Sequence, residues 1–157
     1  MARRSQRLLF LIWLCFVIRL VFYAAVYPMW EGLDEWGHMA YIDHLRQTGN
    51  SPASQTSVSG EIAASFFLLP LAPHLPSYVG AGVSHAEYWK LPQEERKRRE
   101  QALHALRLDL PPLPQVRAEN YQAQHPPLAY WLLVTLDRAM EFEDLPSRVY
   151  ALRMALV

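Results

Sequence analysis

The chain is short of cysteine and has no excess of either charge. Its single cysteine, Cys15, lies inside a long apolar run, so a disulfide framework is excluded. The 15 Lys and Arg residues balance the 15 Asp and Glu residues, which gives a formal net charge of zero. A nucleic-acid partner requires a basic excess or a basic stripe, so this balance argues against one. The sequence also lacks internal repeats, which excludes a repeat architecture.

Apolar residues are plentiful but unevenly distributed. They make up 52% of the sequence and concentrate in residues 8–29 and 126–157, whereas the middle is polar and rich in proline. A soluble domain with one evenly layered core would not show this division. The length allows one modest domain. The distribution predicts a mainly α-helical membrane protein.

Residues 8–27 (LLFLIWLCFVIRLVFYAAVY) form the longest apolar run and predict a transmembrane helix. A helix of these 20 residues reaches about 30 Å, which is the thickness of a hydrocarbon core. Residues 1–7 carry three arginines and are expected to stay in the cytoplasm. The chain that follows is therefore expected on the outer face of the cell's inner or plasma membrane, with Tyr23, Tyr27 and Trp30 at the interface.

Two alternatives within this run stay open. Ala24 and Ala25 lie near a candidate cleavage point of a signal peptide, but the apolar run is long for such a peptide and favours a retained anchor. Arg19 lies in the outer half of the span, where a charge is costly. Its guanidinium is expected either to snorkel to the outer headgroups or to contact an anionic lipid-linked ligand or a following acid.

The stretch after the run, WEGLDEWGHMAYIDHL, is crowded with acids and histidines. A helix over 33–48 is predicted between two flanking glycines. At 100° per residue, Asp34, Glu35 and His38 share one arc of this helix. Asp43 points to the opposite side and is expected to be solvated. Three polar groups are therefore predicted to converge beside the outer end of the span.

Residues 28–125 are expected to form an outer-face loop that contains short helices. Ser84 and Glu87 have the spacing of a capping box. The mixed-sign run EERKRRE (94–100) predicts a solvated helix with charge pairs, and contact with lipid phosphates is the alternative. The other predicted segments are irregular chain at 50–60, helix at 61–69, irregular chain at 70–83, helix at 92–107 and extended chain at 108–116.

Two further segments close the chain. The Pro-Pro pair at 126–127 predicts the start of a helix that runs to about Met140. Its apolar stretch is too short to cross a bilayer, so residues 126–146 are expected to be a juxtamembrane helix and an acidic turn on the outer surface. Residues 147–157 are predicted to begin a second span that the sequence does not complete. The chain is therefore expected to be the N-terminal piece of a larger multi-span protein.

This order of features resembles the opening of the GT-C membrane glycosyltransferases. The nearest groups are the protein O-mannosyltransferase and lipid A aminoarabinose transferase superfamily and its DE-x-x-H…QPPL-Y-Y membrane relatives. The motifs that carry the resemblance are DEWGH (34–38) and YQAQHPPLAY (121–130). Arg148 or Arg153 matches the arginine that opens the next span in that family. The resemblance covers the layout of nearly the whole chain but only these two motifs in detail.

The resemblance implies transfer of a sugar from a polyprenyl-phosphate donor to an acceptor on the outer face. It implies that Asp34 is the catalytic residue, with Glu35 as the alternative. A divalent cation, Mg or Mn, that bridges carboxylate and phosphate is compatible with this chemistry, but no cofactor is assigned. A further acidic residue is expected in the loop, and the choice stays open among Glu61, Asp109 and Glu119. The candidate substrate-binding residues are Arg19 and His38, which could meet the phosphate, and the motif residues Tyr121, Gln124 and His125.

Two other functions compete with this interpretation. A zinc peptidase is disfavoured because D-E-x-x-H lacks the two histidines that share a helical face in H-E-x-x-H, and His44 falls off that face. The second is an outer-face binding module that is anchored by a single span and has no catalytic role. The chain alone is expected to be inactive, since the family builds its donor cavity from many spans.

Overall fold

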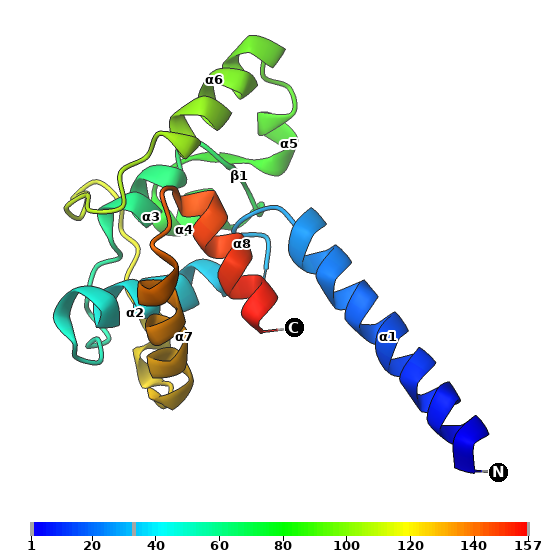
Figure 1. Cartoon of the computed structure of the whole chain (residues 1–157). Coiled ribbons are helices and arrows are strands. Elements are labelled where there is room, and N and C mark those ends of the chain that lie inside the picture. The colour runs from blue at the N-terminus through cyan, green and yellow to red at the C-terminus, as the bar shows by residue number, and fades with distance from the viewer. Residues whose placement is uncertain (1, 33, 157) are drawn as a thin grey trace.

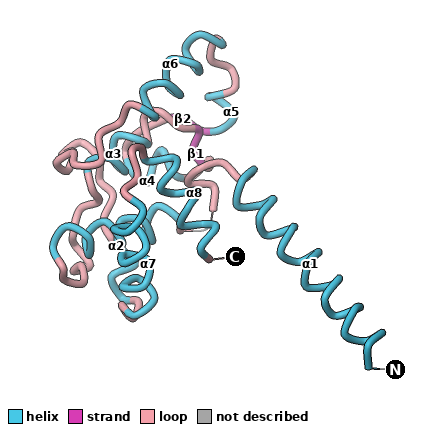
Figure 2. The backbone as a smooth tube through the Cα atoms, viewed as in Figure 1, coloured by secondary structure: helices cyan, strands magenta, loops and turns pink. Residues whose placement is uncertain are grey.

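The computed structural model describes residues 2–32 and 34–156, with side chains from residue 5 onward (Figure 1). It is mainly helical, as predicted, and Figure 2 shows how little of the described chain is strand. Leu33, the predicted first residue of the helix after the apolar run, lies outside the described residues. In chain order the elements are α1 (Ala2–Val26), α2 (Glu35–Thr48), α3 (Gly60–Ser65), β1 (Pro70–Leu71), α4 (Leu75–Val79), β2 (Val83–Ser84), α5 (His85–Tyr88), α6 (Gln93–His104), the 3-10 helix η1 (Tyr121–Gln124), α7 (Leu128–Met140) and α8 (Leu145–Ala155).

Helix α1 projects away from the rest of the molecule (Figure 1). Its segment Ser5–Val26 has a mean hydropathy of 2.5 and none of it is buried inside the protein. A core helix of a soluble domain would be mostly buried, so this interpretation does not fit α1. By length and composition the helix can cross a membrane, and a signal sequence near the N-terminus meets the same criterion.

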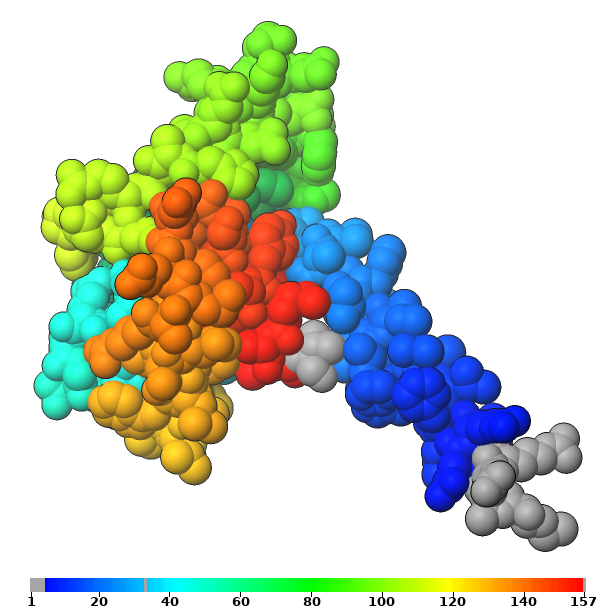
Figure 3. Space-filling model, in the orientation of Figure 1, coloured from blue at the N-terminus to red at the C-terminus, as the bar shows by residue number. Residues whose placement is uncertain are grey.

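The remaining helices pack into one body around α2. Helices α2 and α7 share the largest interface, where the rings of Tyr41 and Tyr130 stack with centroids 3.8 Å apart. Helix α8 lies between α7 and the base of α1, as the space-filling view shows (Figure 3). Trp36 of α2 packs against Phe66 and Tyr121, with ring centroids 5.8 and 4.9 Å away. These contacts bring the start of α2, η1 and the N-terminal half of α7 together.

The segment predicted as irregular at 70–83 contains more order than expected. Helix α4 and strand β1 lie within it, and β1 pairs with β2 in parallel through the register Pro70↔Val83 and Leu71↔Ser84. Gly82 lies directly before β2 and has a φ of 79°. A Cβ at this position would lie 2.1 Å from the carbonyl oxygen of Phe66, so only glycine fits there. Strands β1 and β2 have two residues each, which is too short for an alternation of apolar and polar residues, so the sequence could not predict them.

The charged region at α5 and α6 agrees with the predicted pattern. Ser84 and Glu87 form the capping box, with the Ser84 amide donating to the Glu87 carboxylate at 3.0 Å. Glu95 binds both Arg98 and Arg99, at 2.8 and 2.9 Å, which confirms the expected charge pairs. Helix α6 ends at His104, earlier than the predicted end at residue 107.

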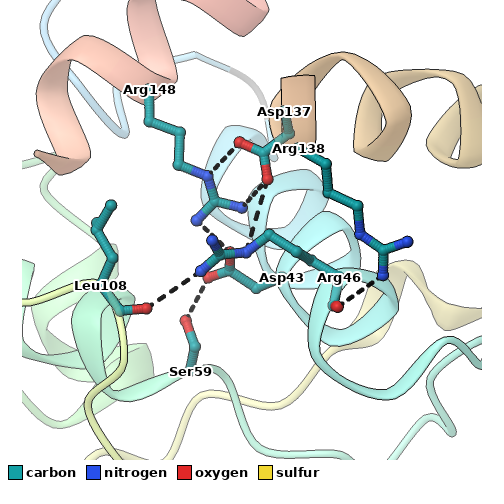
Figure 4. A network of polar contacts seen from close by, with 7 residues as sticks. All are labelled: Asp43, Arg46, Ser59, Leu108, Asp137, Arg138 and Arg148. Atoms are coloured by element: carbon teal, nitrogen blue, oxygen red, sulfur yellow. Dashed lines mark hydrogen bonds and ion pairs between the residues drawn. The ribbon is translucent and has the colours of Figure 1, made fainter. Parts of the chain in front are cut away.

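A buried ion-pair network joins α2, α7 and α8 (Figure 4). Arg148 is fully buried, and its Nε and Nη2 atoms donate to the Asp137 carboxylate at 2.6 and 2.8 Å. Its Nη1 atom forms an ion pair with Asp43, which also accepts a hydrogen bond of 2.5 Å from Ser59. Arg46 lies 3.6 Å from Asp137. Loss of one partner would leave a buried charge uncompensated, so the network holds the three helices together.

The expectation that Asp43 is solvated is wrong. Its side chain is 1% exposed, because the face of α2 that carries it is covered by α7, α8 and the chain at Ser59. Arg148, one of the two arginines matched to the start of a second span, lies inside the body of the protein. Helix α8 begins at Leu145, where the Asp144 carboxylate accepts from the Ser147 amide at 2.7 Å. The assignment of 147–157 to a second span stays a prediction.

Candidate functional site

A cavity of about 720 Å³ lies between α2, α7 and α8. Met39, Leu133 and Leu152 belong to its mostly apolar wall. Its polar lining residues come from three helices and the Pro-Pro motif, and they are Glu35, His38, His125, Tyr130 and Arg153. The cavity therefore combines a long apolar surface with a small group of polar side chains, which is the usual composition of a ligand site.

Asp34 lies beside this cavity but not on its wall. It precedes α2 with a φ of 60°, in the left-handed region that Asp adopts more readily than most residues. Its Oδ1 atom accepts a hydrogen bond of 2.7 Å from the Tyr121 hydroxyl. Burial and this bond to Asp34 raise the pKa of Tyr121 well above its ordinary value, so the phenol stays protonated as the donor. Glu35 and His38 thus line the cavity, whereas Asp34 lies close to them but just off its wall.

Gly37 explains how η1 comes so close to the start of α2. A Cβ at this position would lie 3.0 Å from the Cε1 and Cζ atoms of Tyr121 and 3.0 Å from Cγ of Gln122. A side chain there would push the Tyr121 ring away from Asp34. Sequence reasoning noted this glycine only as part of the DEWGH motif, and a helix-interior glycine beside an aromatic motif was the available signal.

Glu35 and Arg153 form an ion pair at the junction of three helices. The Glu35 Oε2 atom accepts from Arg153 Nη2 at 2.7 Å and from the Trp30 amide at 2.8 Å. Arg153 also donates to the carbonyls of Ala24, Tyr27 and Pro28, at 3.1, 2.5 and 2.9 Å. The last carbonyls of a helix lack partners within it, and a cation there is favourable. Arg153 therefore joins the end of α1 to the start of α2, a pairing that sequence reasoning missed.

His38 is a hydrogen-bonding group whose surroundings favour the neutral imidazole. Its Nδ1 atom lies 2.7 Å from the Tyr130 hydroxyl, and its ring centroid lies 6.1 Å from that of His125. Burial first, and the charge of His125 second, lower the pKa of His38 below its ordinary value. Burial raises the pKa of Tyr130, which stays a phenol. If Tyr130 donates to Nδ1, the ring carries its proton on Nε2.

The other predicted substrate-binding residues lie in different places. His125 lines the cavity, and its carbonyl accepts from the Tyr41 hydroxyl at 3.4 Å. Gln124 is exposed on η1 and is not on the cavity wall. Arg19 is exposed on α1, with its guanidinium 5.5 Å from the ring centroid of Tyr23. The structure thus brings His38, Tyr121 and His125 to the region of Asp34 but leaves Arg19 and Gln124 apart from them.

None of the three candidates for a further acidic residue lines the cavity. Asp109 is exposed and binds Arg107 at 2.7 Å, and Glu119 is exposed in the bridge to Ser57. Glu61 is fully buried, and burial and the adjacent Asp43 carboxylate raise its pKa to about 8. Within residues 2–32 and 34–156, no group of three or more His, Cys, Asp or Glu side chains is arranged to hold a metal ion.

The cavity can bind an amphipathic ligand, and the Asp34 carboxylate lies beside it. The apolar wall suits a hydrocarbon chain, while Tyr130, His38 and His125 supply hydrogen bonds at its polar part. Asp34 supplies an acceptor for a hydroxyl proton beside the cavity. Comparisons with protein-family models, with curated proteins and with solved structures found no match to this chain, so the glycosyltransferase resemblance rests on the order of features and the two quoted motifs.

Proposed function

We propose that this chain is the N-terminal part of an integral-membrane glycosyltransferase that uses a polyprenyl-phosphate sugar on the outer face. The observation that carries the proposal is the cavity of about 720 Å³, whose wall combines an apolar surface with Glu35, His38, His125 and Arg153. Arg153 binds the carbonyls at the end of α1, so these polar groups lie where the proposed span would leave the hydrocarbon. A lipid-linked donor needs an apolar path and polar groups at that same depth.

Asp34 is the proposed general base. In the transfer, the acceptor oxygen forms a bond to the anomeric carbon of the sugar, and the bond from that carbon to the donor phosphate breaks. The lipid phosphate leaves with the electron pair, and Asp34 takes the acceptor proton. Its Oδ1 atom is held by Tyr121, which leaves Oδ2 for the acceptor hydroxyl. Glu35 is less suited to this role because it is bound to Arg153.

The test is Asp34→Asn in the full-length protein, assayed for sugar transfer in vesicles that contain polyprenyl-phosphate sugars. Loss of a general base is expected to lower the rate by about 10²–10⁴-fold. Asp109→Asn, at an exposed acid outside the cavity, is the matched control and is expected to retain the wild-type rate. A wild-type rate in Asp34→Asn would refute the assignment of Asp34 as the base.

A second function, an anchored outer-face module that binds a ligand without catalysis, is favoured by one observation. Both acids of the DEWGH motif already have partners, since Asp34 binds Tyr121 and Glu35 binds Arg153. Such bonds are typical of residues that shape a binding site. Binding of the lipid-linked sugar by a full-length protein that transfers none of it to any acceptor would favour this module over the enzyme.

A further inference from the structure

A second hollow lies beside the start of α8 and shares no lining residue with the cavity described above. Its volume is about 770 Å³, and we call it the Trp89 hollow. Its wall combines the end of α1 with α5, α6 and the start of α8, and the residues that matter are Val26, Pro28, Trp89, Arg96, Lys97 and Tyr150. The proposed function makes no use of this hollow.

Two cations of α6 face this hollow without a carboxylate partner. Arg98 and Arg99, on the same helix, both bind Glu95, whereas Arg96 and Lys97 form no ion pair within the described part of the chain. Both line the hollow. The mixed-sign run EERKRRE (94–100) thus places two adjacent positive charges without an ion pair on the wall of the hollow.

Arg96 is held in place by an aromatic ring rather than by an acid. Its guanidinium carbon lies 4.9 Å from the centroid of the Trp89 ring, within the range of a cation–π interaction. Its Nε atom is buried and has no hydrogen-bond acceptor among the described residues. A buried donor without an acceptor is costly. The carboxylate of Glu100, also on the wall, is exposed and forms no ion pair there, so the missing acceptor is not supplied by the chain as described.

The hollow lies at the depth of membrane headgroups if α1 crosses the bilayer. Val26 and Pro28, at the outer end of α1, form part of its wall. Trp89 and Tyr150 are 56% and 37% exposed, and amphipathic aromatic side chains favour the membrane–water interface. Lipid phosphates lie at this same depth, and they are oxygen-rich anions that suit an arginine and a lysine.

We propose that the Trp89 hollow binds the headgroup phosphate of an anionic phospholipid of the outer leaflet. Arg96 and Lys97 bind the phosphate oxygens, and Trp89 and Tyr150 lie beside the glycerol region. The proposal rests on the part of the proposed function that makes α1 a transmembrane helix, and it is independent of sugar transfer. A lipid bound here connects α6 to the bilayer and limits the tilt of the outer-face body.

The test measures lipid retention by the whole chain. The protein is reconstituted in bilayers of phosphatidylcholine with phosphatidylglycerol, released into detergent, and weighed by native mass spectrometry. Wild type is expected to retain phosphatidylglycerol in preference to phosphatidylcholine. Arg96→Gln with Lys97→Gln is expected to lower this retention roughly 30-fold, as for two basic residues near an anionic surface. The matched control, Arg98→Gln with Arg107→Gln, removes the same charge from exposed ion pairs outside the hollow and is expected to retain the lipid.

Each outcome decides the proposal. Equal retention of the two lipids by wild type, or wild-type retention by the Arg96 and Lys97 double variant, overturns the lipid site while the span stands. Displacement of the lipid by excess inorganic phosphate overturns the assignment to a phospholipid, because the hollow would then accept any phosphate. Failure of wild type to insert into either bilayer overturns the proposed span and this site with it. Circular dichroism melts of both double variants check that neither has unfolded.

Discussion

Glu61 provides the sharpest test of the buried network, because its proton links folding to pH. Its side chain is fully buried, and burial and the neighbouring Asp43 carboxylate raise its pKa from 4.5 to about 8. The folded chain therefore keeps this proton up to about pH 8, whereas the unfolded chain releases it near pH 4.5. The Arg148 guanidinium opposes this shift but is neutralised by Asp43 and Asp137.

The sign and size of the effect follow from this difference. Between pH 4.5 and 8 the folded state binds more protons than the unfolded state, so the free energy of unfolding falls as pH rises. One pKa unit corresponds to about 1.4 kcal/mol, so the stabilisation that Glu61 contributes at low pH falls by on the order of 5 kcal/mol across this window. Above pH 8 the contribution is lost and the dependence on Glu61 ends.

Glu61→Gln removes this dependence because glutamine cannot ionise. Relative to wild type, the variant is expected to gain stability steadily from pH 5 to pH 8, since only the wild type loses it. Urea unfolding in detergent, followed by circular dichroism at several pH values, measures the difference between the two proteins. Groups other than Glu61 largely cancel in that difference. Glu119→Gln, at an exposed position, is the control and is expected to show no such trend. A wild-type-minus-variant difference that is the same at pH 5 and pH 8 would refute the buried proton.

Three further predictions concern the helices around the cavity. Gly37→Ala is expected to push the Tyr121 ring away from Asp34 and to cost about 1–3 kcal/mol of unfolding free energy, measured by urea denaturation. Asp43→Asn leaves a fully buried guanidinium short of one partner and is expected to cost about 3–5 kcal/mol, whereas Asp109→Asn at the surface should cost under about 1 kcal/mol. His38 is expected to titrate below its ordinary pKa of 6.5 in a nitrogen NMR titration, because it is buried next to His125. A His38 pKa above 6.5 would contradict the neutral imidazole.

The sequence predicted well those helices whose start, end or apolar pattern is encoded by residues of the helix itself. The Pro-Pro pair and the apolar run predicted α7, which ends at Met140 as expected. The capping box at Ser84 and Glu87 depends on two residues three positions apart, and it is present. The apolar run at the N-terminus likewise predicted α1, a helix that is long and apolar enough to cross a membrane. Local chemistry is enough to define such elements.

The burial of Asp43 shows what such patterns cannot supply. A helical wheel correctly separates its direction from that of Glu35 and His38, but it does not say what covers either side of a helix. Asp43 is covered by α7, α8 and the chain at Ser59, which come from distant parts of the sequence. The Glu35–Arg153 pair joins residues 118 positions apart, and neither residue alone signals the other. Contacts of this kind depend on the packing of α8, which no local pattern specifies.

The contacts of Arg153 with the carbonyls at the end of α1 link the orientation of that helix to the position of α2. Ser5–Val26 comprises 22 residues, so at 1.5 Å per residue it is about 33 Å long, slightly more than a hydrocarbon core of about 30 Å. A helix of this length tilts further in a thinner bilayer. The Arg153 guanidinium binds the Ala24 carbonyl of α1, the Tyr27 carbonyl just beyond it and the Glu35 carboxylate. For a membrane-spanning α1, a change in tilt would therefore move the first turn of α2 and the cavity wall that it forms. If α1 spans the membrane as proposed, bilayer thickness would therefore affect the cavity wall through the Arg153 side chain.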